Sequence, residues 1–279
     1  MKYLNLGCGT HYHEGSEWTN LDFVSSGPRV IAHNLLQGVP FQSETFDLVY
    51  HSHVLEHFSK QDGEKLIEEC FRVLKPGGVI RIAIPDLEQI VRNYLRFLEA
   101  GMQQPHDENI RCNYEWMMIE MYDQTVRNQS GGNMAAYIYQ DQMINEDFVY
   151  QRIGEEGRAL RKGYLSNQMQ SSHGKPVSIS MVKRINASIR YRLRRFFIKQ
   201  LQIDERAHQI GKFRLGGEIH QWMYDRYALS NLLIKKGGDK ISIRGAFDSY
   251  ISNWEHYGID GKNGKVRKPD SLFIEAIKK

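Results

Sequence analysis

The chain of 279 residues contains 41% hydrophobic and 25% charged residues, the composition of an ordinary globular protein that can bury a sizeable core. Its net charge of +4 is too mild to indicate a nucleic-acid partner by itself, and no apolar stretch approaches the roughly 18 residues needed to span a bilayer. Three scattered cysteines, Cys8, Cys70 and Cys112, exclude a disulfide framework, and without a CxxC pair they give no sign of zinc.

Residues 1–92 alternate between strand-like apolar runs and helix, which is typical of a parallel sheet. The expected strands cover 3–6, 19–23, 29–32, 46–50 and 79–84. Apolar residues at helical spacing predict a helix over 63–74, which ends at Lys75-Pro76-Gly77-Gly78. We expect a loop over 11–17, because little chain separates the first two strands.

The pattern changes after residue 92. No strong strand pattern appears from there to about 215, so we expect a mostly helical insertion. The expected helices cover 87–100, 114–126, 134–153 and 178–201, with loops at 101–112, 128–133 and 166–177. Beyond 219 the sequence predicts a helix over 227–236 closed by Gly237-Gly238, strands at 241–243 and 271–277, and a loop at 258–268.

The first strand ends in Gly7-Cys8-Gly9 and the second ends in Asp22. Glycines let the backbone pass close to a ligand, and a carboxylate on a neighbouring strand can accept hydrogen bonds from a ribose diol. A dinucleotide site would carry a third glycine opening a helix and an acid about 20 residues further on. Here Asp22 follows after a shorter interval and the loop 11–17 replaces the helix start, so the ligand is not expected to be a dinucleotide.

Further motifs follow in the order used by class I S-adenosylmethionine-dependent methyltransferases. They are Leu4–Gly9, Asp22, Phe46–Val49, Val54-Leu55-Glu56-His57 and Arg72-Val73-Leu74-Lys75-Pro76-Gly77-Gly78. The chain most resembles the bacterial type 11 methyltransferases, including members associated with surface-glycan biosynthesis. The resemblance implies a Rossmann-like α/β fold: a seven-stranded, mainly parallel sheet with helices on both faces and an antiparallel last strand. It divides the chain into a methyltransferase domain, 1–92 and 216–279, and a helical insertion, 93–215, expected to be an acceptor-binding cap.

The resemblance also implies S-adenosylmethionine as the cofactor. Gly7 and Gly9 would let the turn pass under its methionine part, and Asp22 would bind its ribose hydroxyls. The other predicted cofactor contacts are Asn5, Cys8, Asn34, Leu35, His51 and His53. Asn5 stands where the family often has an acidic residue, so it offers hydrogen bonds without charge, and Asn34 has an alternative role as a turn residue.

Two residues are candidates for catalysis. His220 is expected where the chain returns over the cleft, and because histidine titrates near neutrality it is predicted to be a general base on a sugar hydroxyl, with a structural histidine as the alternative. Asp86 ends the central strand and would hold the acceptor, act as a base, or cap the following helix. Methyl transfer needs only modest help of this kind, because the sulfonium is already activated.

The run from His53 to His57 resembles the Glu-x-x-Glu-His motif with which some RNA and quinone methyltransferases of this fold hold a divalent metal, with histidine replacing the first glutamate. Such a cluster suits a transition metal. The same run is common in relatives thought to need none, where Glu56 and His57 cap or pack. We therefore expect no metal.

Two stretches of the insertion are singled out. A stripe including Trp116, Met117 and Met121 is predicted to be core, followed by Gln124, Arg127 and Asn128, which could bind a polyhydroxylated acceptor. Residues 182–199 alternate basic and apolar side chains and are expected to form a solvated helix packed through its apolar side. The alternative is a helix lying on an anionic membrane, which would suit a lipid-linked glycan substrate.

The sequence therefore predicts an enzyme that transfers a methyl group to an oxygen of a sugar or glycan intermediate. It is expected to be cytoplasmic, with the membrane's inner face as an alternative site, because no signal peptide is visible. Its partner would be a small-molecule or glycan acceptor, and no nucleic acid is expected. The alternatives are an RNA or other small-molecule methyltransferase and a non-catalytic S-adenosylmethionine-binding module, against which the Gly7, Gly9 and Asp22 set argues.

Overall fold

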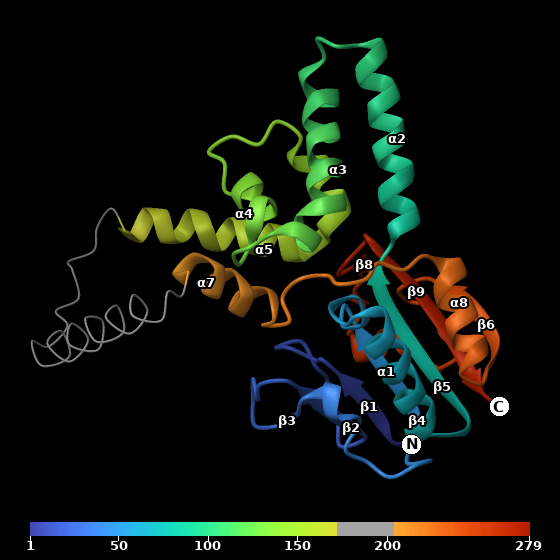
Figure 1. Cartoon of the computed structure of the whole chain (residues 1–279). Coiled ribbons are helices and arrows are strands. Elements are labelled where there is room, and N and C mark those ends of the chain that lie inside the picture. Colours follow the sequence, from blue (N-terminus) through green and yellow to red (C-terminus); the bar gives the residue numbers. More distant parts are fainter. Residues whose placement is uncertain (172–203) are drawn as a thin grey trace, which may run out of the picture.

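A seven-stranded sheet forms the centre of the protein in the computed structural model, which describes residues 1–171 and 204–279 (Figure 1). The strands are β1 (Tyr3–Leu6), β2 (Trp18–Asp22), β3 (Val30–Ala32), β4 (Phe46–Ser52), β5 (Leu74–Pro85), β6 (Gly238–Arg244) and β9 (Ser271–Lys278). They lie in the order β3-β2-β1-β4-β5-β9-β6, parallel from β3 to β5, with β9 antiparallel to both neighbours. This confirms the predicted seven-stranded, mainly parallel sheet.

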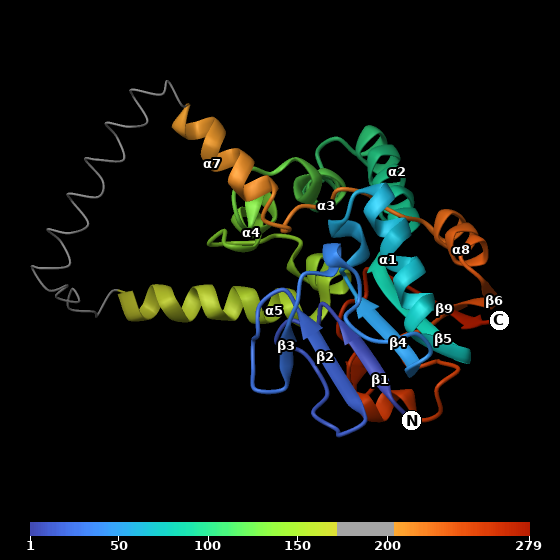
Figure 2. The same ribbon diagram turned by 60° about the horizontal axis from the view of Figure 1, so that its bottom comes forward.

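The central strands are apolar on both faces because each face packs against another layer. On one face, α1 (Lys60–Val73) and α8 (Arg226–Lys235) cover a core that contains Leu6, Val49 and Ile82. On the other face, the segment between β6 and β9 packs Trp254 of the short helix η3 (Trp254–Tyr257) near Tyr50 of β4. Figure 2 shows β1, β2 and β3 joined by loops alone, and no helix forms over 11–17, as expected.

A helical unit lies beyond the carboxyl end of β5 (Figure 1). Its helices are α2 (Leu87–Gln103), α3 (Glu108–Val126), α4 (Gly132–Ile138), α5 (Glu146–Ser171) and α7 (Glu205–Arg214). The first four of these helices enclose a separate apolar cluster in which Trp116 and Met117 are fully buried, which confirms that this stripe is core. The expected boundary at 92/93 falls inside α2, and the expected helix 178–201, with the basic stretch 182–199, lies outside the described residues.

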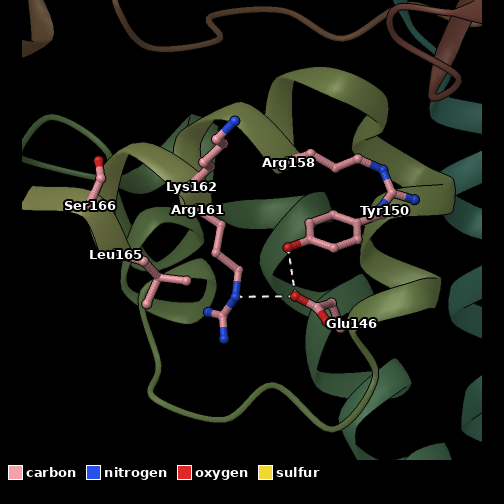
Figure 3. A pocket seen from close by; sticks show the side chains of 7 residues that line it. All are labelled: Glu146, Tyr150, Arg158, Arg161, Lys162, Leu165 and Ser166. Atoms are coloured by element: carbon pink, nitrogen blue, oxygen red, sulfur yellow. Dashed lines mark hydrogen bonds and ion pairs between the residues drawn. The ribbon is translucent and has the colours of Figure 1, made fainter. Parts of the chain in front are cut away.

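The predicted single helix over 134–153 is wrong, because α4 ends at Ile138 and α5 begins only at Glu146. Arg161 of α5 explains the break: its guanidinium binds the carbonyl oxygens of Ile138 and Gln140, so the end of α4 is satisfied without further helix. Arg161 also pairs with Glu146 at 3.2 Å, and the Tyr150 hydroxyl donates to the same carboxylate (Figure 3). The predicted loop 101–112 is shorter than expected, since α2 reaches Gln103 and α3 starts at Glu108.

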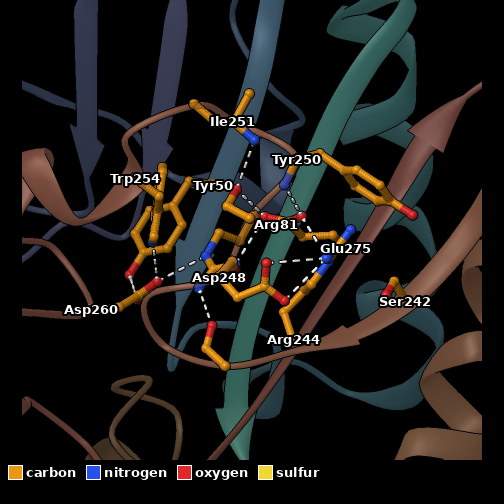
Figure 4. A network of polar contacts seen from close by, with 12 residues as sticks. Tyr50, Arg81, Ser242, Arg244, Asp248, Tyr250, Ile251, Trp254, Asp260 and Glu275 are labelled. Atoms are coloured by element: carbon orange, nitrogen blue, oxygen red, sulfur yellow. Dashed lines mark hydrogen bonds and ion pairs between the residues drawn. The ribbon is translucent and has the colours of Figure 1, made fainter.

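A buried arginine fixes the segment between β6 and β9 to the sheet. Arg81 of β5 is fully buried and pairs with Asp260 at 2.8 Å and Glu275 at 2.9 Å (Figure 4). Its remaining donors reach the carbonyl oxygens of Gly245, Ala246 and Asp248. The expected loop 258–268 contains the hairpin β7 (Gly261–Lys262) and β8 (Lys265–Val266) next to this network.

Candidate active site

The glycine turn and Asp22 meet at the carboxyl edge of the sheet. Gly7 and Gly9 both have positive φ angles, 63° and 56°, which glycine adopts without strain. The Gly9 amide donates to Asp22 Oδ2 at 2.6 Å, and the Cys8 amide donates to the Leu21 carbonyl at 3.0 Å. The structure thus brings together the three residues on which the predicted cofactor site depends.

The same edge carries exposed apolar side chains. Phe23 and Val24 follow Asp22 and are 69% and 65% exposed, and Leu36 beyond β3 is 65% exposed. Asn34 accepts a hydrogen bond from the Leu36 amide at 3.0 Å, which is the turn-forming alternative for this residue, and Leu35 packs against the main core. Large apolar side chains in solvent beside a polar turn are typical of a ligand-binding edge.

Two predicted cofactor contacts are buried. Asn5 is 1% exposed and donates to Asn20 Oδ1 at 3.2 Å, because the two residues face each other in the β1–β2 register. His51 lies within β4, which runs to Ser52 rather than ending at residue 50, and its side chain is fully buried. Both side chains are thus closed to solvent in this structure, and the cofactor contacts of Asn5 and His51 stay predictions. Cys8 is buried, and burial raises the pKa of its thiol to about 12, which fits a filler rather than a nucleophile.

Asp86 caps the helix that follows the central strand. Its carboxylate accepts from the Gln89 amide at 3.1 Å, and its own amide donates to the Asp270 carbonyl at 2.9 Å. This confirms the capping alternative. Asp270 itself is a residue that the sequence analysis missed: one of its carboxylate oxygens is buried without a hydrogen-bond partner among the described residues, and burial raises its pKa to about 7.

A cluster of histidines surrounds a buried glutamate where β4 ends. Glu56, His57 and His220 have ligand-type atoms within 4.8 Å of one another. His53 Nδ1 lies 3.3 Å from Glu56 Oε1, and His220 Nε2 lies 4.0 Å from the same oxygen. The amides of Gln221 and Trp222 both donate to the Glu56 carbonyl, which ties the segment before α8 to the turn after β4. The sequence analysis did not connect His220 with this turn.

Burial controls the charges in this cluster. It raises the pKa of Glu56 to about 8 and lowers the pKa of His220 to about 2, with smaller contributions to the latter from His57 and Arg127. Burial also lowers the pKa values of His53 and His57. The expectation that His220 titrates near neutrality is therefore wrong, because its ring is almost inaccessible to water. At pH 7 these imidazoles are neutral.

A cavity of about 470 Å³ opens beside His220. Its lining comes from the end of α3, the end of α7 and the segment before α8: Thr125, Arg214, Leu215, Ile219, His220, Gln221, Trp222 and Met223. Of the predicted acceptor-binding residues, Arg127 pairs with Glu218 at 3.1 Å, and the Gln124 carbonyl accepts from the His220 amide. The helical unit therefore supplies part of the wall of a cavity that touches the histidine cluster.

Comparison with known proteins gives a family match for one part of the chain. Residues 15–82 match the family described as a methyltransferase domain. Over 60 residues the chain is 40% identical to a probable S-adenosylmethionine-dependent methyltransferase of Mycolicibacterium smegmatis, a match that covers 21% of this chain and about a quarter, 23%, of that protein. Residues 15–82 thus resemble a methyltransferase domain, which supports the coarser part of the predicted resemblance.

Solved structures of similar proteins include a methyltransferase of Thermotoga maritima described as a possible histamine N-methyltransferase. Its sequence is 10% identical to this one, and the TM-score is 0.38. The match covers 100% of this chain and 82% of the Thermotoga chain. The PH0226 protein of Pyrococcus horikoshii is 21% identical, with a TM-score of 0.28, over 34% of this chain and 54% of its own. Within residues 1–171 and 204–279, no helix has the length and apolar character to cross a membrane.

Proposed function

We propose that the protein is an S-adenosylmethionine-dependent methyltransferase that methylates an oxygen of a sugar or glycan intermediate. The observation that carries the donor half is the contact between the Gly9 amide and the Asp22 carboxylate at the carboxyl edge of the parallel strands. Ligands of open α/β sheets bind at this edge. The methyltransferase-domain match at 15–82 includes Asp22 and the strands around it, which supports this choice of cofactor.

The cofactor can be accommodated with few changes. Two backbone amides, of Gly9 and Val24, hold the Asp22 carboxylate, and an ionised carboxylate has lone pairs left for two ribose hydroxyls. The exposed side chains of Phe23 and Leu36 would cover the adenine and lose their contact with water. The glycine turn would carry the methionine part toward His53, because Gly7 lies directly against Val54.

The acceptor half rests on the cavity beside His220. Trp222 is 41% exposed there, and Thr125, Gln221 and Arg214 bring polar groups to the same wall. An aromatic face combined with hydrogen-bonding groups suits a polyhydroxylated ring, since the ring has apolar faces and a polar rim. We infer that residues 93–215 act as an acceptor-binding cap on a methyltransferase domain formed by 1–92 and 216–279.

The reaction would need alignment more than strong base catalysis. The carbon–sulfur bond of the sulfonium breaks as the carbon–oxygen bond to the acceptor forms, and the hydroxyl proton leaves to a base or to water. A neutral His220 can accept that hydrogen bond and orient the hydroxyl, although burial makes it a weak base.

A labelling experiment tests the proposal. The purified chain is incubated with methyl-labelled S-adenosylmethionine and separate panels of sugar nucleotides, free oligosaccharides and structured RNA, with Asp22→Ala as the inactive control. Label in a sugar product supports the proposal, and label in RNA would replace the acceptor half with the RNA alternative. If calorimetry shows no binding of S-adenosylmethionine by the parent protein, the donor half is wrong as well.

A further inference from the structure

We propose that Glu56, His57 and His220, with His53 beside them, bind a divalent first-row transition-metal ion. The three ligand-type atoms lie within 4.8 Å of one another, on side chains that are buried or nearly so. The sequence run from His53 to His57 predicts no metal by itself, because the same run is common in relatives thought to need none. The structure adds the buried imidazole of His220, whose Nε2 lies 4.0 Å from Glu56 Oε1, and this changes the inference.

The Glu56 carboxylate lacks a compensating group. Its side chain is fully buried, and neither oxygen has a hydrogen-bond donor among the described residues. A carboxylate withdrawn from water without donors or a cation is costly, so it must either keep a proton or share a cation. Imidazole nitrogens of His53 and His220 lie 3.3 and 4.0 Å from its Oε1, and neutral imidazoles are common metal ligands.

The histidine His57 is already oriented as a ligand. Its Nδ1 lies 3.1 Å from the carbonyl oxygen of Ile219, and a carbonyl can only accept, so Nδ1 carries the hydrogen. This leaves the lone pair on Nε2. Metal-bound histidines commonly donate their other ring N–H to a backbone carbonyl in this way, which fixes the tautomer and the ring direction.

The backbone at His53 supports a constrained site. Its φ angle is 54°, in the left-handed region that a residue with a β-carbon rarely adopts, and its amide donates to the Ala83 carbonyl at 2.8 Å. The ring Nε2 lies 2.8 Å from Ser271 Oγ, which leaves Nδ1 on the side of Glu56. The unusual backbone thus directs a second imidazole toward the same carboxylate.

The distances suit an ion after a small contraction. Metal–nitrogen bonds of about 2.1 Å allow two ligands of one ion to stand up to about 4.2 Å apart. His220 Nε2 and Glu56 Oε1 are 4.0 Å apart, and the whole set lies within 4.8 Å. Side-chain rotations that bring the most distant pair about 0.6 Å closer therefore reach this limit. Imidazole nitrogens with one carboxylate favour ions such as zinc, cobalt or nickel over magnesium and calcium.

The cavity beside His220 would give a further ligand access to the ion. His220 also lines the cavity of about 470 Å³, so a ligand from the cavity could complete the coordination. This role rests on the proposed function, because it places the acceptor hydroxyl of the methyl transfer in that cavity. Binding of the ion does not depend on it.

The test titrates Co²⁺ into chelator-treated full-length protein and follows the visible d–d absorption, with Zn²⁺ as competitor and Mg²⁺ as the hard-ion control. We expect one equivalent to bind, zinc to displace it, and Glu56→Gln and His220→Ala each to weaken binding roughly tenfold or more. His106→Ala, which removes an exposed histidine outside the cluster, is the matched control and should bind as the parent does.

Two outcomes would overturn the site. The first is no cobalt binding by protein whose thermal transition shows it to be folded. The second is binding by the parent with an affinity unchanged in both Glu56→Gln and His220→Ala, each checked for folding in the same way. Calorimetry with S-adenosylmethionine on the same metal-free protein separates this failure from that of the proposed function, since cofactor binding without metal would leave the methyltransferase proposal intact.

Discussion

Gly7 and Val54 are in such close contact that a β-carbon added at position 7 would stand 2.3 Å from Val54 Cγ2. Gly7 follows β1 and Val54 follows His53, so this contact joins the cofactor turn to the turn that carries the histidine cluster. The proposed site for the methyl donor and the histidine cluster beside the proposed acceptor cavity therefore meet at this one packing contact.

Substitution of Gly7 should break that junction. Gly7→Ala adds both a steric clash and the strain of a positive φ angle, and we expect it to lower the free energy of unfolding by about 2–4 kcal/mol. Gly9→Ala is the matched control, because a β-carbon there meets nothing within 4 Å and only the φ strain of about 1 kcal/mol remains. Urea denaturation of both variants measures the difference, and equal losses would contradict the role given to the Val54 contact.

The Asp22 carboxylate should matter for cofactor affinity more than for folding. Hydrogen bonds to charged groups contribute about 1.5–3 kcal/mol, so Asp22→Ala should weaken S-adenosylmethionine binding by roughly 10- to 100-fold. Asp239→Ala, an exposed aspartate at the far end of β6, should change the dissociation constant little. Calorimetry measures both, and an unchanged affinity in Asp22→Ala would remove it from the cofactor site.

Much of the sheet could be predicted because its strands are short apolar runs bounded by glycine, proline or acidic residues. The strand ends were harder to predict, and the predicted location of His51 depended on one of them. The prediction ended β4 at residue 50 and placed His51 at the cleft, whereas β4 continues to Ser52 and His51 shares the buried face of Val49. A strand buried on both faces has no alternation of polar and apolar residues that would mark where it ends.

The histidine cluster could not be predicted as a unit. Glu56 and His220 are brought together by backbone hydrogen bonds from Gln221 and Trp222 to the Glu56 carbonyl, and no local pattern encodes contacts over such a separation. The break between α4 and α5 has a similar cause, because it depends on Arg161 reaching back to Ile138. Sequence spacing reveals what a segment prefers, while these positions are decided by partners far along the chain.

The Arg81 network should be a main support of the C-terminal segment. Arg81→Ala leaves Asp260 and Glu275 as buried carboxylates without their partner, and breaking a buried pair in this way costs about 3–5 kcal/mol. Arg92→Ala, which removes an exposed ion pair with Glu88, should cost less than about 1 kcal/mol. Chemical denaturation compares the two, and similar small losses would show that the network is not needed for stability.

Trp222 should affect the acceptor but not the cofactor. Its half-exposed ring lines the cavity beside His220, so Trp222→Ala is expected to raise KM for the acceptor about tenfold while leaving the affinity for S-adenosylmethionine unchanged. Tyr227→Ala removes an aromatic ring that is 77% exposed outside that cavity and should leave both values unchanged. Steady-state kinetics with the acceptor from the labelling screen provide the measurement. A KM for Trp222→Ala equal to that of the parent would show that the acceptor does not bind against Trp222.

The stability of the metal-free protein should fall as the pH rises through neutrality, because of Glu56. Burial raises the pKa of Glu56 to about 8 in the folded chain, above its ordinary value of 4.5, so the folded state keeps a proton that the unfolded state has lost. The stability contributed by that proton is complete below pH 4.5 and is lost as the pH rises toward 8. Each unit of pKa difference corresponds to about 1.4 kcal/mol, which makes the total on the order of 5 kcal/mol. Glu56→Gln cannot ionise, so its free energy of unfolding relative to that of the parent should increase steadily between pH 5 and pH 8 in denaturation experiments. At pH 8, Zn²⁺ should stabilise the parent alone and so remove this difference in stability. Parallel stability curves for the two proteins across this range would show that Glu56 is compensated by another group.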